Sequence, residues 1–231
     1  MRLFVTATSL CMVLTGCNFA EPCTSPSFDG HVYQVVEIGE QCWFAENLRS
    51  QHYANGDPIP YPRSDESWMT QEGGSRCFYA DDSASLQLYG QLYNGLAVLD
   101  SRGLCPSGWH VPRDQDWQLL EKHGGMPQAE AALEGYRGME LGLGTMLKSK
   151  QGWSNQSIGT DALGFHALPG GDRFANRSNV PFAGDFGYWW SSSSTGDKMW
   201  LRTLSSQNPG IKRGSADLRY GFSVRCIQNA Q

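Results

Sequence analysis

The sequence predicts a single domain of the α+β class, and three observations lead to this prediction. A helical pattern occupies the stretch 112–124, and patterns typical of strands precede and follow it. The 231 residues show neither an internal repeat nor a linker that would divide them. The 27 glycines and 11 prolines favour many turns and little helix. Strands and helices in separate stretches of one chain are typical of an α+β fold.

The first 16 residues have the pattern of a secretory signal peptide. Arg2 precedes an apolar run that is too short to span a bilayer, and small residues follow it. The segment LTGC at 14–17 is similar to the bacterial lipobox, in which a lipid is attached to the cysteine, here Cys17. The alternative is an ordinary signal peptide followed by a chance cysteine. Asn18 favours the outer membrane, because Asp at this position would be similar to an inner-membrane retention signal.

After the leader we expect a flexible tether at 17–27 and then the domain, residues 28–231. The domain opens with a predicted β-hairpin, whose strands at 32–38 and 42–45 flank a turn. Residues 49–76 are largely polar and rich in turn signals, so we expect a long loop there.

The strongest helix pattern lies between Pro112 and Gly124. Proline suits the first turn of a helix, and Asp114 and Asp116 complement the positive end of its dipole. A second helix is expected within 128–148, with a break because four glycines weaken it.

From Gly164 onward the sequence predicts strands separated by turns. In the last strand, apolar Phe222 and Val224 alternate with polar Ser223 and Arg225, which predicts a half-buried strand. The expected strands are at 188–193, 199–204 and 220–227, and the expected turns are at 195–197, 208–210 and 213–215.

Charge and cysteine spacing argue against two classes of function. A net charge of −5 gives no electrostatic case for nucleic-acid binding, which requires a basic face. The five cysteines that follow the lipobox are too widely spaced for a metal site, and no cofactor is expected. Disulfides are the default in an exported protein. The odd count leaves one thiol over, and the candidate is Cys23 in the tether.

Six motifs, in order along the chain, resemble those of the Fibrobacter succinogenes major paralogous domain, a family of exported bacterial proteins. The match extends over about residues 28–228. Among the departures, Arg113 stands where the family often has a helix-capping serine, so we expect the helix start to depend on Asp114 instead. The motifs are QCWFAENL at 41–48, YGQLYN at 89–94, CPSGWHVP at 105–112, GFHALPGG at 164–171, YWWSS at 188–192 and GFSVRC at 221–226.

The resemblance implies a C-type-lectin-like fold, with the N-terminal hairpin beside the C-terminal strand and the helix at 112–124 packed on the sheet. It also implies a disulfide between Cys105 and Cys226. Cys42 and Cys77 are then left as a plausible second pair. The family supplies no catalytic residues.

Several residues could recognise a ligand or serve the structure alone. Of Trp189 and Trp190, neighbours on one strand, at most one can face a ligand such as a sugar. His110 could be a base or a metal ligand, but a structural histidine bonded to backbone is the better interpretation. The C-terminal third is either the recognition face or a solvated edge that discourages aggregation. Its candidate residues are Asp172, Arg173, Trp190, Lys198, Trp200, Arg202, Lys212, Arg213 and Arg219.

The sequence therefore predicts a lipid-anchored protein of the cell envelope that recognises a glycan or a protein and is not an enzyme. The membrane is its expected partner, through the lipid on Cys17. The alternative is a carbohydrate-active or protein-modifying enzyme on the same scaffold, although neither a nucleophile–base motif nor a serine elbow is present. A structural envelope protein without a small ligand is the third possibility.

Overall fold

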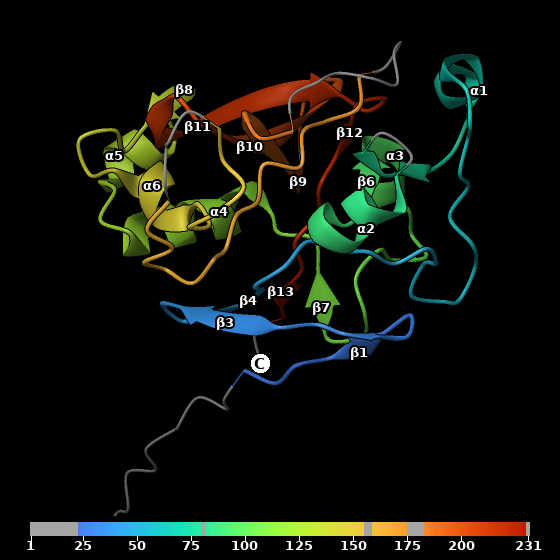
Figure 1. The fold of residues 1–231 in the computed structure, drawn as a ribbon, viewed down its shortest axis with the longest axis horizontal. Coiled ribbons are helices and arrows are strands. Elements are labelled where there is room, and N and C mark those ends of the chain that lie inside the picture. Colours follow the sequence, from blue (N-terminus) through green and yellow to red (C-terminus); the bar gives the residue numbers. More distant parts are fainter. Residues whose placement is uncertain (1–22, 80–81, 155–158, 175–182, 230–231) are drawn as a thin grey trace, which may run out of the picture.

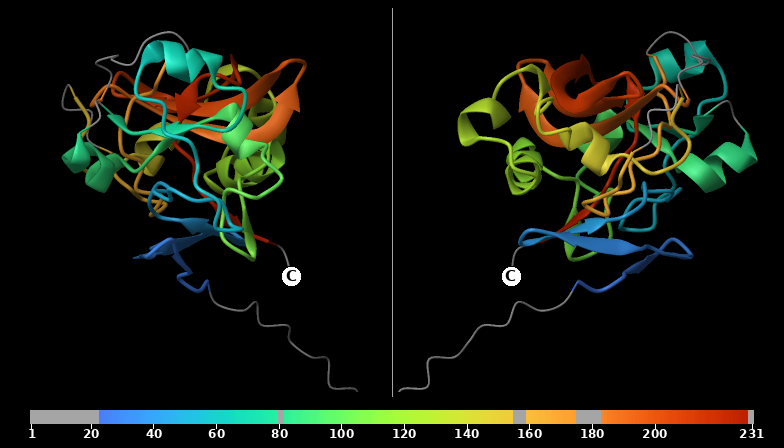
Figure 2. Two further views of the ribbon diagram at one scale, coloured as in Figure 1. Left: turned by 90° about the vertical axis from the view of Figure 1, so that its right-hand side faces the viewer. Right: turned by 60° about the vertical axis from the view of Figure 1, so that its left-hand side comes forward.

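The computed structural model describes residues 23–79, 82–154, 159–174 and 183–229. Two four-stranded sheets organise the molecule, and all their strand pairs are antiparallel. In Figures 1 and 2 the smaller sheet lies below the larger one in every view. The larger sheet has the order β8 (Gly135–Arg137), β11 (Asn208–Asp217), β10 (Lys198–Ser205), β9 (Phe186–Thr195). The smaller sheet has the order β3 (Val35–Ile38), β4 (Gln41–Phe44), β13 (Ile227–Gln228), β7 (Trp109–His110).

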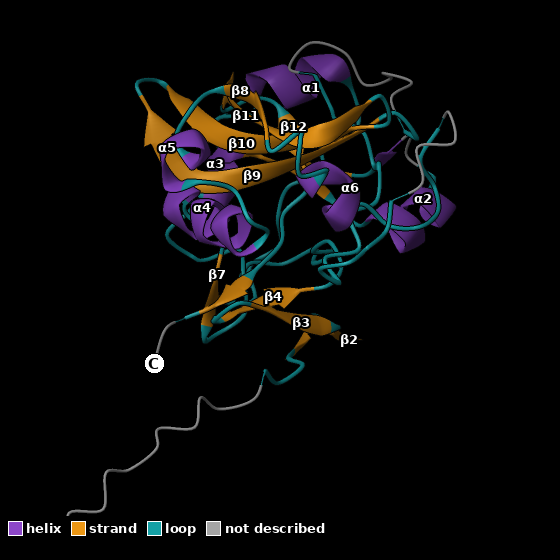
Figure 3. Cartoon of the chain, turned by 90° about the vertical axis from the view of Figure 1, so that its left-hand side faces the viewer, coloured by secondary structure: helices purple, strands orange, loops and turns teal. Residues whose placement is uncertain are grey.

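Short elements complete the described fold, and Figure 3 shows several of the helices beside the larger sheet. The strands are β1 (Ser27–Phe28), β2 (His31–Val32), β5 (Arg76–Cys77), β6 (Leu92–Asn94) and β12 (Gly221–Phe222). The helices are α1 (Asp65–Thr70), α2 (Ser83–Tyr89), α3 (Gly95–Val98), α4 (Asp114–His123), α5 (Gln128–Ala131) and α6 (Leu143–Leu147).

These elements confirm a single α+β domain and the central features of the predicted arrangement. The hairpin β3–β4 lies beside the C-terminal strand, because Trp43 of β4 pairs with both Val36 and Ile227. Helix α4 lies within the predicted stretch, and its Trp117 and Leu120 share a buried core with residues of the larger sheet. The second predicted helix is broken, as expected, although the break holds strand β8.

Two predicted turns in the C-terminal third are wrong, since residues 208–210 and 213–215 belong to strand β11. Gly210 marks a close approach of two backbones and not a turn. A Cβ at this position would lie 2.5 Å from the carbonyl oxygen of Arg137 on the neighbouring strand β8. Glycine within a strand often has this role.

The long polar loop predicted at 49–76 contains helix α1 and the start of β5. Ser64 caps α1, since its hydroxyl accepts from the backbone N–H of Ser67 and the Ser67 hydroxyl lies within hydrogen-bond distance of the Ser64 N–H. This reciprocal arrangement is a capping box, in which serine takes the place of the usual glutamate. Helix α2, also missed, starts at a similar cap, where Asp82 accepts from the N–H groups of Ala84 and Ser85.

The last predicted strand, at 220–227, is not continuous, because only β12 and β13 at its two ends are strands. It is also buried on both sides instead of one, since every residue from 221 to 227 is buried. Arg225 is tolerated because its guanidinium donates to the carbonyl oxygens of Phe44, Phe165 and His166 and to the side chain of Asn47. Burial lowers the pKa of Arg225 to about 9. The polar side chain of Arg225 thus serves as a hydrogen-bond donor to backbone carbonyl groups inside the core, and it does not mark a solvent-exposed face.

The structure confirms the disulfide between Cys105 and Cys226 and corrects the second pair. Cys42 is bonded to Cys23, and their Cα atoms are 5.6 Å apart. The N–H of Tyr33 also donates to the carbonyl of Pro26, and this bond holds the segment after Cys23 near the start of the β3–β4 hairpin. Cys77 is buried on β5, in a different sheet from Cys42, and takes part in neither disulfide. The predicted pairing of Cys42 with Cys77, and Cys23 as the unpaired residue, are therefore wrong.

Candidate functional site

The structure separates the residues of the predicted recognition face. Five of its side chains are buried, so the expectation that they form an exposed surface is wrong. Lys198 and Lys212 are exposed, and Trp200 and Arg219 are half-buried. The buried members are Asp172, Arg173, Trp190, Arg202 and Arg213.

Neither tryptophan of the pair on β9 offers a ring to a ligand. Trp189 is 1% exposed and donates from its indole nitrogen to the side chain of Asn47. Trp190 is fully buried and donates to the carbonyl of Tyr93. Both rings belong to the core, one on each side of the sheet.

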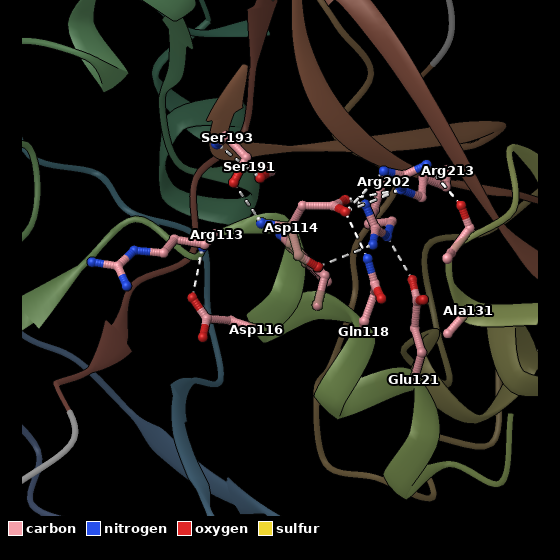
Figure 4. Close-up of polar contacts among 12 residues, drawn as sticks. Arg113, Asp114, Asp116, Gln118, Glu121, Ala131, Ser191, Ser193, Arg202 and Arg213 are labelled. Carbon is pink, nitrogen blue, oxygen red and sulfur yellow. Dashed lines mark hydrogen bonds and ion pairs between the residues drawn. The ribbon is translucent and has the colours of Figure 1, made fainter. Parts of the chain in front are cut away.

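Most of the buried charge lies in a network between α4 and the larger sheet (Figure 4). Arg202, on β10, donates from Nε to Glu121 and from a terminal nitrogen to Asp114 at 2.7 Å. Arg213, on β11, holds both carboxylate oxygens of Asp114 and lies 3.4 Å above the ring of Trp200. Arg137, on β8, forms a two-pronged ion pair with Glu121. We call these three arginines and two acids the ionic network.

The ionic network determines how α4 begins, and it corrects the expectation that Asp114 caps this helix. The carboxylate of Asp114 is turned toward the sheet, while its own N–H donates to the hydroxyl of Ser193. Asp116 is the capping residue, because its carboxylate accepts from the N–H of Arg113 at 2.7 Å. In Figure 4 the side chain of Arg113 points away from the network.

Asp114 should make folding stability sensitive to acid. Burial by itself raises the pKa of this carboxyl, but hydrogen bonds from Arg213 and the charge of Arg202 outweigh it and lower the pKa to about 2. A carboxyl whose pKa is lower in the folded chain stabilises above its unfolded value of 3.8 and loses this effect as the pH falls toward 2. We expect Asp114 to contribute about 2 kcal/mol to the fall in the free energy of unfolding between pH 4 and pH 2.

Urea unfolding at several pH values measures this contribution. Asp114→Asn should be destabilised at pH 7 and should lose about 2 kcal/mol less than the native chain on acidification. The same acid sensitivity in both proteins would show that Asp114 titrates normally in the folded state. Asp197 is exposed and provides the control Asp197→Asn.

A pocket of about 250 Å³, open to solvent, lies where α3, β7, β9 and the start of α4 meet. Its walls combine apolar side chains with three polar ones: His110, Arg113 and Ser192. The Cys105–Cys226 disulfide holds one wall to the residue that directly precedes β13. The remaining lining residues are Val98, Gly103, Leu104, Cys105, Trp109 and Val111.

His110 is a structural histidine, but it is bonded to side chains and not to backbone as predicted. One ring nitrogen lies 2.6 Å from the side-chain oxygen of Asn229, and the other lies 3.3 Å from the carboxylate of Asp116. Ser192, across the same pocket, donates its hydroxyl proton to the carbonyl of Val111. Because both ring nitrogens are engaged elsewhere, His110 and Ser192 do not form a nucleophile–base pair.

Ser192 and Ser193 link the pocket to the ionic network. The backbone N–H of Ser192 donates to the carbonyl of Pro112, and Ser193 binds Asp114 at the adjacent position. The two neighbours of Arg113, which are Pro112 and Asp114, are therefore both hydrogen-bonded to β9, and these bonds fix the start of α4. Sequence reasoning singled out His110 but missed Arg113 and Ser192 as members of one site.

A family model, the Fibrobacter succinogenes major domain, matches residues 36–228 of this chain. The chain belongs to this family. All the structural elements of the site lie within the matched residues, so the pocket and the ionic network are part of the Fibrobacter succinogenes major domain itself. No curated protein and no solved structure matches the chain.

The described residues contain neither a membrane-spanning helix nor a metal site. In the described part of the chain, no helix is long and apolar enough to cross a membrane, and no cluster of His, Cys, Asp and Glu could hold a metal ion. The predicted leader and the lipidation site Cys17 lie outside the described residues.

Proposed function

We propose that this protein is a lipid-anchored binding module of the cell envelope, and that the pocket at the start of α4 is its ligand site. The supporting observation is the pocket itself, in which apolar walls surround a few fixed polar groups, as in many binding sites. The two disulfides in the described part of the chain suit an oxidising compartment outside the cytoplasm. The lipid on Cys17, the outer-membrane location and a lectin-like mode of recognition belong to this proposal.

The pocket suits binding better than catalysis. Two of its three polar groups are held by neighbours, since His110 contacts Asp116 and Asn229, and the proton of Ser192 is directed at a carbonyl. The ligand we propose is a glycan, because a shallow open site of this size accepts one sugar ring of a longer chain. Binding of a protein is the competing outcome of the test.

A glycan array and a pull-down from envelope extracts test the proposal. The protein should be the whole chain with Cys17→Ser, exported so that its disulfides form. A fragment beginning at residue 28 would lack Cys23 and leave Cys42 without its disulfide partner.

We expect at least one class of glycan to bind, and Val98→Trp, which fills the pocket, to abolish that binding. Lys198→Ala and Trp200→Ala, on the sequence-predicted face, should leave it unchanged. Loss of binding in these two variants but not in Val98→Trp would place the site on β10 and contradict the proposal. Circular dichroism should show that each variant is folded.

A further inference from the structure

The rim of the pocket carries a cation that the fold does not use. The side chain of Arg113 is exposed and makes neither a hydrogen bond nor an ion pair with any residue in the described ranges. Asp116, a carboxylate that influences it, is already held by the Arg113 N–H and by His110. A guanidinium is planar and presents several N–H groups in a fixed fork, which matches the two oxygens of a carboxylate.

Ser192 adds a second requirement on the ligand. Its hydroxyl proton is directed at the carbonyl of Val111, at 2.9 Å, so toward a ligand its oxygen acts as a hydrogen-bond acceptor. A ligand group opposite Ser192 must therefore be a donor, such as a hydroxyl. His110 offers no free nitrogen, because both its ring nitrogens are engaged.

The size and walls of the pocket limit the ligand to one compact group. A volume of about 250 Å³ is below the range of roughly 300–1,000 Å³ that is usual for sites of drug-sized ligands. Val98, Leu104 and Trp109 provide apolar surface, which suits the C–H face of a sugar ring. One ring that carries both a carboxylate and hydroxyl groups meets all these conditions.

We infer that the pocket between Arg113 and Ser192 binds a uronic acid residue of an acidic glycan. The inference rests on the proposed function and adds the class of sugar. Arg113 holds the carboxylate in a two-pronged pair, Ser192 accepts a proton from a neighbouring ring hydroxyl, and the apolar wall covers one face of the ring. An acidic peptide side chain offers the carboxylate but has no hydroxyl within the same group.

Isothermal titration calorimetry with galacturonic and glucuronic acid trisaccharides tests this inference, with the neutral galactose and glucose trisaccharides as matched ligands. The native chain should bind a uronate trisaccharide at least about tenfold more tightly than its neutral counterpart. Arg113→Ala should remove that preference, and added salt should weaken binding to the native chain. Ser192→Ala should weaken binding to a smaller extent. Lys150→Ala, which removes another exposed cation, is the control and should bind as the native chain does.

Equal binding of neutral and acidic trisaccharides, or a preference that survives in Arg113→Ala, would overturn the inference and leave the proposed glycan function intact. Binding of a poly-glutamate peptide with no affinity for either uronate would also overturn it. Failure of every glycan and of the pull-down would overturn the proposed function as well.

Discussion

Glu121→Gln should lower the free energy of unfolding by about 3–5 kcal/mol, because it leaves buried cations without their counter-charge. Glu121 is fully buried and accepts hydrogen bonds from Arg137 and Arg202 at 2.5–2.9 Å. Once its charge is removed, Asp114 alone must balance three guanidinium groups in the ionic network. Glutamine has nearly the shape of glutamate, so the loss reports charge and hydrogen bonding more than packing.

Urea unfolding followed by tryptophan fluorescence measures this effect, because the buried ring of Trp117 lies 5.9 Å from the guanidinium of Arg202 in the ionic network. Glu140→Gln, at an exposed position, makes the same chemical change and should alter stability by less than about 0.5 kcal/mol. If Glu121→Gln fails to fold, export yield and protease resistance of the two variants provide the comparison. Equal stability of both would show that the ionic network does not hold α4 on the sheet.

Loss of the Cys105–Cys226 disulfide should cost more than loss of Cys23–Cys42. The first bond closes a loop of 121 residues and the second a loop of 19 residues. In the chain-entropy model, longer loops give more stabilisation, and the expected losses are about 5 and about 3 kcal/mol. The first bond also forms part of the pocket wall, so its removal should weaken ligand binding as well.

The double variants Cys105→Ala/Cys226→Ala and Cys23→Ala/Cys42→Ala, unfolded in urea, allow this comparison with the same chemistry at both sites. Alkylation of the free thiols in the unfolded, unreduced protein, followed by peptide mapping, provides a separate check. Among the cysteines that the structure describes, only Cys77 should be alkylated. A larger loss in the second variant, or alkylation of Cys23 in place of Cys77, would contradict this account.

Patterns local in sequence predicted the elements that also depend on local interactions. The Pro112-to-Gly124 helix and the N-terminal hairpin were found because apolar spacing and turn residues act over a few positions. Helix α1 was missed because its serine capping box lacks the usual acidic residue. Strand β11 was missed because Gly210 and Gly214 resemble turn residues, while the β8 strand that pairs with β11 is distant in sequence.

The candidate site was harder to predict, since exposure of charged residues is decided by tertiary contacts. Arg202 and Arg213 were expected on a surface because arginine is seldom buried. Their burial depends on Asp114 and Glu121, which lie about 80 to 100 positions away and are brought near by packing. The same limit applies to the second disulfide, since cysteine count alone leaves the connectivity open.

If Cys17 carries the proposed lipid, the bond between Cys23 and Cys42 restricts how far the body can move from the bilayer. Five residues separate Cys23 from Cys17, the predicted point of acylation. Even fully stretched, that connection spans only about 20 Å. The body would then stay within roughly its own radius of the lipid headgroups, with the β3–β4 hairpin on the side nearest them. Ligands that it could reach are those in the layer of envelope immediately above the membrane.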